Sequence, residues 1–310
     1  MTGRLLLRQA VGLVLVAWTV ATVTFGLMHW IPGGPFDREK QLPPEILANV
    51  EAKYRLDEPL LRQYIRYLSG LLRGDLGPSY TYLGRTVQEI ILEALPVSLA
   101  LGALALFLSV ALGLLLGLVA ALRPGGCLDR AAMAAAAAGM ALPTFLLGAM
   151  LMVGVGMGLG LLPPALWEGW THAVLPALTL ALGPAAYMAR LIRSGLLEVL
   201  RQDFVRTARA KGLSTRRILL KHALRASIGP VVTYLGPLTA ALVTGSFVVE
   251  TLFSVPGLGR HFVSAVTNRD YPLILGVTLV YTLLVYVANA AVDWMYRILD
   301  PRTLAEDASS

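Results

Sequence analysis

The chain has 310 residues, of which 56% are hydrophobic and only 15% are charged, and its mean hydropathy is +0.67. Soluble domains carry about 25% charged residues, so the composition excludes an ordinary soluble domain and indicates a membrane protein. The net charge of +7 raises nucleic-acid binding as an alternative, which the placement of the charges argues against below.

Long apolar runs predict the spans, because a helix needs about 20 mainly apolar residues to cross a bilayer. The first run follows Arg4 and Arg8, as in a signal peptide. It exceeds the signal core of about 7–15 residues and ends in no cleavage site, so we expect it to persist as a helix. A five-span count is the alternative, because the fourth run holds two prolines. The six predicted spans are 10–31, 96–122, 131–158, 173–192, 228–250 and 273–296.

The basic residues follow the positive-inside rule for a chain with both ends in the cytoplasm. With six spans and the N-terminus inside, the cytoplasmic segments hold 16 of the 26 Lys and Arg residues, ten of them from Arg190 to Arg225. The two short outer loops hold only Arg260 and Arg269. The basic excess is therefore attributed to topology and not to a DNA-binding face.

The long segment 32–95 is predicted to form a folded helical cap on the outer surface. Pro43 and Pro44 precede "EILANVEAKY", and "EPLLRQYIRYLSGLL" has apolar residues at helical spacing, so two short amphipathic helices are expected. A partly mobile connector is the alternative. Thr86 and Glu89, three residues apart, form a capping-box pattern that starts the next helix.

Small residues gather in the second and third spans, in "GLLLG" at 113–117, "AAMAAAAAG" at 131–139 and "GVGMGLG" at 154–160. Because small residues let helix backbones approach closely in lipid, they predict a tightly packed bundle. Pro143 in "ALPTF" is predicted to kink the third span, either as a hinge or as a fixed bend.

The sequence offers no chemistry of its own. Its four histidines have no metal-ligand spacing, and its single cysteine, Cys127, cannot form an internal disulfide. No GxxxxGK[ST] nucleotide-binding motif is present. If the protein moves a solute uphill, the energy must come from a partner or an ion gradient.

The stretch "RTARAKGLSTRR" at 206–217 has five basic residues among twelve and no acidic one. We predict a helix from Asp203, acting as its N-cap, to a left-handed stop at Gly212, and a second helix from Ser214 or Thr215. The residues alone favour two interpretations equally. One is docking into a groove of a soluble partner, and the other is contact with anionic lipid.

Two further stretches are candidates for a pore or gate. In "FSVPGLGRHF", Pro256, Gly257 and Gly259 are predicted to make a tight turn in the last outer loop. This turn is a gate, a docking edge for the binding protein of a transporter, or a plain connection between helices. "LVTGSFVVE" places polar residues where either a pore face or helix packing would use them. The candidate pore and gate residues are Pro143, Thr244, Gly245, Ser246, Glu250, Pro256, Gly257 and Gly259.

The basic loop resembles the EAA loop of permease subunits in bacterial ABC importers. In "DFVRTARAKGLSTRRILLKHALR", Ala208 and Gly212 match the second Ala and the Gly of that family. Arg206 and Thr207 replace the leading Glu-Ala, and the Ile-x-Leu-Pro ending is absent, departures that peptide-importer permeases share. The stretches "WIPGGPF", "GDLGPS", "VVETLFSVPGLGRHFV", "NRDYP" and "LDPR" extend the resemblance to B-type subunits of oligopeptide importers over nearly the whole chain.

The resemblance implies an all-α polytopic membrane protein of six transmembrane helices with the type I ABC importer permease fold. Its parts would be a first transmembrane helix, an outer helical segment, a transmembrane core with the coupling loop 193–227, and a cytoplasmic tail. Their bounds are 1–31, 32–95, 96–300 and 301–310.

The resemblance also implies a function. The chain would be a pore-forming subunit of the bacterial inner membrane, not an enzyme, that translocates peptides delivered by an extracytoplasmic binding protein. Its partners would be a second, homologous permease in a heterodimer and two ATPase subunits that bind ATP and Mg, with no cofactor in this chain and no nucleic acid. The implied ATPase-coupling interface is Asp203, Phe204, Arg206, Thr207, Ala208, Arg209, Ala210, Lys211, Gly212 and Leu213.

Two other functions are weaker on the sequence. A secondary carrier usually has inverted repeats or acids at the membrane midplane, and a membrane enzyme needs a nucleophile–base pair within its spans. Neither stands out in the sequence. The chain has a basic loop suited to docking but no nucleotide-binding motif. This combination favours a transport protein whose energy is supplied by a separate subunit.

Overall fold

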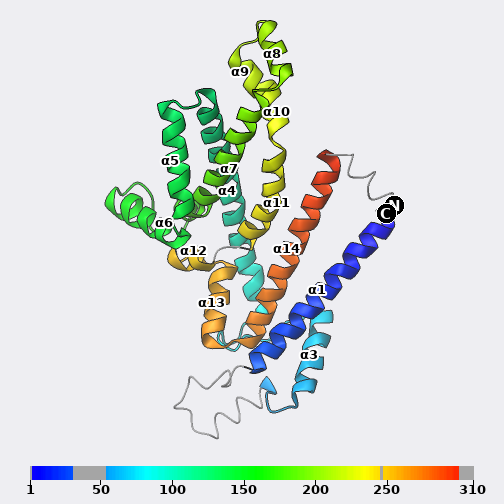
Figure 1. The fold of residues 1–310 in the computed structure, drawn as a ribbon. Coiled ribbons are helices and arrows are strands. Elements are labelled where there is room, and N and C mark those ends of the chain that lie inside the picture. The colour runs from blue at the N-terminus through cyan, green and yellow to red at the C-terminus, as the bar shows by residue number, and fades with distance from the viewer. Residues whose placement is uncertain (1, 31–53, 245–246, 300–310) are drawn as a thin grey trace. The chain divides into compact units, whose positions relative to one another are not determined.

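A computed structural model of the chain describes residues 2–30, 54–244 and 247–299 (Figure 1). The regular elements within these ranges are helices, together with one isolated bridge between Pro78 and Thr86. The all-helical architecture expected from the apolar periodicity is therefore confirmed for the described residues.

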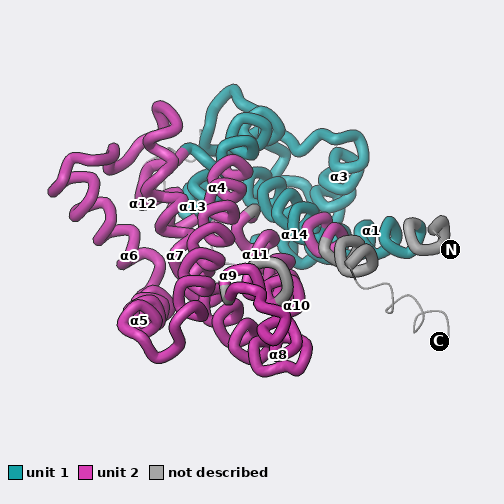
Figure 2. Tube along the Cα trace, turned by 90° about the horizontal axis from the view of Figure 1, so that it is seen from above, with its two compact units in different colours: residues 1–97, 256–286 teal, residues 98–255, 287–310 magenta. Residues whose placement is uncertain are grey.

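The chain divides into two compact units, which are coloured separately in Figure 2. Unit 1 combines residues 1–97 with 256–286, and unit 2 combines residues 98–255 with 287–310. Each unit joins stretches that are far apart in the sequence.

Four helices are individually long and apolar enough to cross a membrane. They correspond to the first, second, fourth and sixth predicted spans. The fourth run is one 30-residue helix despite Pro176 and Pro184 inside it. The four helices are α1 (Thr2–Trp30), α4 (Val87–Leu122), α7 (Trp170–Val199) and α14 (Tyr271–Leu299).

The third predicted span is broken, not merely kinked. Helix α5 (Cys127–Ala141) ends before Pro143, and α6 (Thr144–Leu151) with the π-helical η1 (Met152–Gly158) continues at an angle of 111°. Proline lacks an N–H group and pushes the preceding residue out of the α region, and Leu142 is extended, with ψ of 130°. The bend predicted at this proline is confirmed, and the bent pair is either a fifth, broken span or a re-entrant loop.

The fifth predicted run is helical but shorter than expected. Helix α11 (Gly229–Val243) has 15 residues, about 22 Å at 1.5 Å per residue, which is less than the hydrocarbon core of about 30 Å. Helix α12 (Phe247–Leu252) follows. By length and composition, the described residues thus hold four spans, or five with the broken pair, against the six predicted.

Helix α7 is packed closely within unit 2 because of the small residues of α4. A Cβ atom added at Gly113 would lie 2.7 Å from the Cβ of Met188, and one at Gly117 would lie 2.7 Å from the Cβ of Ile192. Side chains at these positions would separate the two helices. The close approach predicted from "GLLLG" is confirmed within the chain.

Unit 1 has an apolar core where the start of α4 meets α13 (Leu258–Asn268) and the start of α14. Its members include Ile90, Leu258 and Leu273, all nearly or fully buried. The capping box is confirmed, since the N–H groups of Thr86 and Glu89 each bond the other's side chain, at 3.0 and 3.3 Å.

Of the two short helices predicted for the outer segment, the second is present as α3 (Leu60–Leu72). The first lies outside the described residues. Short helices also follow α7 in unit 2 and build the basic loop. They are α8 (Asp203–Ala210), α9 (Thr215–Arg217), the π-helical η2 (Ile218–Ala223) and α10 (Leu224–Ser227).

Candidate functional site

The basic loop forms the helix–turn–helix predicted from its sequence. Helices α8 and α9 project beyond the ends of α4 and α5 (Figure 1). Gly212 has φ of +78°, its N–H donates to the carbonyl of Arg209 at 2.9 Å, and the N–H of Leu213 donates to that of Ala208 at 3.2 Å. This pattern is a Schellman motif, so the predicted left-handed stop is confirmed.

A small apolar cluster holds the two helices of the loop together. Val205 and Ile218 are fully buried, Ala208 is 8% exposed, and Leu200 and Leu213 pack against them. Ala208 and Leu213 belong to the predicted interface, but their side chains serve this internal contact. Because Ala208 is buried, its site has no room for a larger side chain. For the same reason, the Ala208 side chain cannot contact a partner protein.

The other interface residues are exposed. Phe204 is 42% exposed, which is unusual for a large aromatic side chain on a polar loop. Asp203 is the first helical residue, and Gln202 occupies the N-cap without a side-chain bond, so the prediction of Asp203 as N-cap is wrong. Its carboxylate still lies in the first turn, where it complements the helix dipole. The exposed interface residues are Asp203, Phe204, Arg206, Thr207, Arg209, Ala210, Lys211 and Gly212.

The loop presents a positive surface. Arg206 meets Asp203 at 3.4 Å, but both side chains are mostly exposed, and such surface pairs contribute little. No ion pair is formed by Arg209, Lys211 or Arg216 within the described ranges. Unpaired cations beside an exposed aromatic ring suit an acidic groove, since complementary charge guides docking.

The candidate pore residues differ from one another in burial and in hydrogen bonding. Glu250 is fully buried in unit 2 and accepts a hydrogen bond from the Ser98 hydroxyl at 2.9 Å. Thr244 donates its hydroxyl to the Ala240 carbonyl at 2.9 Å and so serves its own helix. Gly245 and Ser246 lie outside the described residues. Pro143 is exposed at the break between α5 and α6.

The tight turn predicted from Pro256, Gly257 and Gly259 is formed by another residue. Ser254 has φ of +55°, and its N–H donates to the Thr251 carbonyl at 3.2 Å. Gly257 is the N-cap of α13, in extended conformation, and Gly259 lies inside that helix. The assignment of the turn to the glycines is wrong, because the left-handed residue that ends α12 is a serine.

Two buried carboxylates were not found from the sequence. Asp129 of α5 accepts two bonds from Arg193 of α7, at 2.5 and 2.7 Å, and is 3% exposed. Asp270, fully buried in unit 1, accepts bonds from the Ser79 hydroxyl and from the Thr81 N–H. An isolated acid next to an apolar helix is the signal they share, but their partners lie 64 and 191 residues away.

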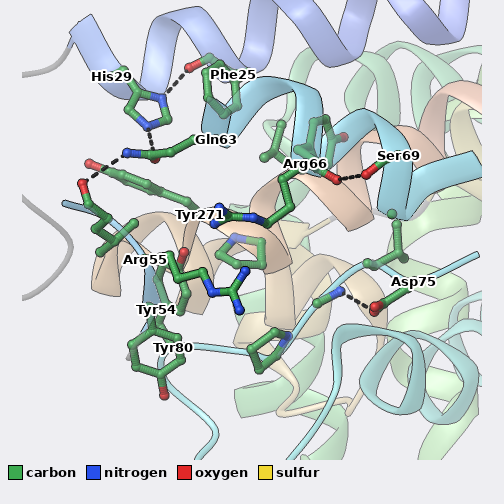
Figure 3. A pocket seen from close by; sticks show the side chains of 18 of the residues that line it. Phe25, His29, Tyr54, Arg55, Gln63, Arg66, Ser69, Asp75, Tyr80 and Tyr271 are labelled. Atoms are coloured by element: carbon green, nitrogen blue, oxygen red, sulfur yellow. Dashed lines mark hydrogen bonds between the residues drawn. The ribbon is translucent and has the colours of Figure 1, made fainter. Parts of the chain in front are cut away.

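Unit 1 also holds a cavity of about 400 Å³ that the sequence does not predict (Figure 3). The ends of α1, α3 and α14 line it with aromatic and basic side chains. His29 contacts the Phe25 carbonyl at 2.8 Å and the Gln63 side chain at 3.4 Å, and Arg66 is paired with Glu58. Some of the polar and charged side chains that line the cavity, such as His29 and Arg66, therefore already have partners within the chain.

Two family models match the chain. Residues 113–305 match the binding-protein-dependent transport system inner membrane component, and residues 2–102 match the N-terminal part of such a component. The chain belongs to this transport family. As its member, it is the membrane component of a transport system and not an enzyme, as the resemblance implied.

The transport component has several similar curated relatives. It is 45% identical over 283 residues to the dipeptide transport system permease protein DppB of Bacillus subtilis, covering 91% of this chain and 92% of the relative. It is 44% identical over the same length to the oligopeptide permease OppB of Haemophilus influenzae. OppB of Escherichia coli is 40% identical over 301 residues, covering 96% and 98%.

The fold of the transport component recurs in solved transporters. The inward-facing MetNI methionine ABC transporter matches with TM-scores of 0.55 and 0.57 at 20% identity, covering 69% and 68% of this chain and 97% and 96% of that one. An amino acid ABC transporter matches with a TM-score of 0.52 at 18% identity, covering 68% and 94%. The predicted importer-permease fold is confirmed.

Proposed function

We propose that this chain is a pore-forming subunit of an ATP-driven importer of peptides, oligopeptides in particular. The exposed basic tip of α8, fixed by its own apolar cluster and by Gly212, is the observation that carries this proposal. Support for the cargo comes from the relatives, three of which are named as dipeptide or oligopeptide permeases. The division into first helix, outer segment, core and tail is part of the same proposal.

The partners follow from the need for an external motor. A second, homologous permease completes the pore as a heterodimer, and two ATPase subunits supply the energy and bind ATP and Mg. A binding protein delivers the peptide from outside. The distribution of basic segments supports, as part of this proposal, a location in the bacterial inner membrane with both termini in the cytoplasm.

Helix α8 serves as the coupling helix. Phe204 enters a groove of the ATPase, and the exposed cations around it meet acidic groups there. Only three residues separate the end of α7 at Val199 from the start of α8 at Asp203. A displacement of α8 during ATP binding therefore reaches α7 through a connection too short to absorb it.

The test is to purify the tagged chain from native membranes in mild detergent and to identify its companions by mass spectrometry. We expect a second multi-spanning chain and one or two ATPases, and loss of the ATPases when residues 206–213 are scrambled. A sequence shuffled within 123–126, a separate cytoplasmic turn, is the control and should retain them. A chain that appears alone and transports in vesicles without ATP would overturn the proposal in favour of a secondary carrier.

A further inference from the structure

Helix α7 carries one exposed polar stripe in its last part. Within residues 187–199, the exposed positions are Tyr187, Arg190, Ser194 and Glu198. Their spacing of three or four residues places them on one face of the helix. All four are polar, in a helix that is otherwise mostly buried.

In the first half of α7, before Tyr187, the same face of the helix is buried. Pro176 and Leu180 precede Tyr187 on this face by whole turns, and both are buried. The face therefore opens at Tyr187 and stays open toward Val199, the end that leads to the basic loop. A face that becomes exposed within a span and stays exposed to one end of it is what a one-sided access path requires.

The stripe lies between two neighbouring helices of unit 2. The ring of Tyr187 meets that of Tyr234 on α11 at a centroid distance of 4.6 Å. Arg190 of the same stripe lies on the other side against α5, with its Nη1 3.7 Å from the sulfur of Met140. The Tyr187–Tyr234 pair therefore lies at the end of the exposed face that is farther from Val199.

Two arginines three residues apart on α7 have different surroundings. Arg193 forms a two-bond ion pair with the buried Asp129. Arg190 is exposed and pairs with no carboxylate in the ranges that the structure describes. An ionisable side chain in a span that lacks a partner indicates function by default.

The chemistry of the stripe identifies what it faces. The large exposed hydrophobic side chains on other helices of unit 2, such as Phe107 on α4, Phe145 on α6 and Val153 on η1, suit lipid or a packed subunit. Lipid tails exclude a row of Arg, Ser and Glu side chains. The stripe therefore faces water or a polar cargo.

We propose that this polar stripe lines the inner half of the translocation path, and that Arg190, beside the Tyr187–Tyr234 pair, binds carboxylate groups of the peptide in transit. The inference rests on the proposed peptide transport and adds the contact that selects for charge. A guanidinium binds a carboxylate through two parallel hydrogen bonds. The two tyrosine rings offer flat amphipathic surfaces to the neighbouring residues of the peptide.

The test compares two peptides that differ in one charge, Ala-Glu-Ala and Ala-Lys-Ala. The complete transporter is placed in liposomes, and the same binding protein delivers both peptides, so any change in their uptake ratio between variants arises in the permease. Arg190→Gln is expected to lower the ratio of Glu to Lys peptide uptake about tenfold, the effect of one charge-assisted hydrogen bond. Arg190→Lys should keep most of the preference, and Arg190→Glu should reverse it.

The matched control is Arg201→Gln, an exposed arginine beyond the end of α7, which should leave the ratio unchanged. Uptake of both peptides falling equally in Arg190→Gln would assign Arg190 a structural role and overturn the inference, while peptide transport itself stands. If the wild-type transporter takes up neither peptide, the proposed function fails, and the inference falls with it.

A second measurement does not depend on changing Arg190. In a Cys127→Ser background, Ser194→Cys on the stripe is compared with Val153→Cys on the apolar surface, using a membrane-impermeant maleimide applied from the cytoplasmic side. We expect Ser194→Cys to be labelled at least about tenfold faster, as an aqueous wall requires, and to be protected by Ala-Glu-Ala. Equal labelling of the two, or no protection by the peptide, would overturn the inference.

Discussion

The core of unit 1 and the basic loop of unit 2 use charged side chains in opposite ways. In unit 1, Asp270 is fully buried and accepts bonds from the Ser79 hydroxyl, the Thr81 N–H at 3.0 Å and the Leu273 N–H at 3.3 Å. In the loop, Asp203 is exposed, and its carboxylate lies 3.4 Å from the guanidinium of Arg206. We call the Asp270 arrangement the carboxylate clamp.

The difference separates architecture from recognition. A buried carboxylate with its hydrogen bonds satisfied ties distant segments together, because removing any partner leaves a polar group unpaired. The basic loop is held together by its apolar cluster, so its exposed charges are not needed for folding and remain available to another protein. The comparison predicts that changes in the clamp affect folding, whereas changes in the loop affect assembly.

The largest effect is expected from Asp270→Ala, which leaves the clamp's donors buried without an acceptor. We expect a loss of about 3 kcal/mol in the free energy of unfolding, since each buried donor left without its acceptor costs about 1–3 kcal/mol. Asp203→Ala is the matched control, with a change within about 0.5 kcal/mol. Thermal unfolding of the two purified variants measures this, and equal melting temperatures would remove the distinction between clamp and loop.

The next effect concerns Phe204, the exposed ring at the tip of α8. Phe204→Ala should leave melting unchanged but weaken ATPase binding about thirtyfold, the loss of about 2 kcal/mol that a central aromatic anchor contributes. Phe107→Ala is the control, because Phe107 is also exposed, at 67%, but lies on a span. Titration of the ATPase onto the detergent-solubilised permease measures the affinity. Equal binding by both variants would contradict the docking role.

A smaller effect is expected from substitutions of Gly212. Glycine is favoured there by the left-handed backbone conformation and not by a side-chain contact. Apart from Gly212 and its two chain neighbours, no atom of the described residues lies within 4 Å of an added Cβ, so substitution meets only the cost of φ at +78°. Gly212→Val should cost about 1–2 kcal/mol locally and lower peptide-coupled ATPase activity, with membrane insertion intact. Gly212→Asn should retain most activity, because Asn tolerates this conformation. Normal uptake by the Val variant would contradict the role of the helix stop.

The sequence predicts features that are set within a few residues and misses those that depend on distant contacts. The stop at Gly212 and the Thr86 capping box follow from local backbone needs, and both are confirmed. The clamp joins residues 191 apart, and Ala208 is buried in a cluster that includes Ile218 from the second helix of the loop. No periodicity in either stretch contains that information.

The smallest effect is a pH dependence in unit 1. Burial lowers the pKa of His261 below its ordinary value, helped by Arg260 and Arg85 and opposed by Glu93. The unfolded chain then binds the proton more tightly, so this contribution to stability is complete above a pH of about 6.5 and is lost as the pH falls below that value. The ring of His261 also meets that of Tyr82 at 5.5 Å, which keeps it in its half-buried site.

Melting curves between pH 8 and pH 5 at constant salt measure this for the wild type and for His261→Gln. The difference between the two proteins should shrink as the pH falls, because only the wild type loses the contribution of a buried neutral imidazole. A constant difference would show that His261 does not titrate differently in the folded chain. The acid sensitivity measured as this difference between the wild type and His261→Gln is therefore assigned to His261 of unit 1.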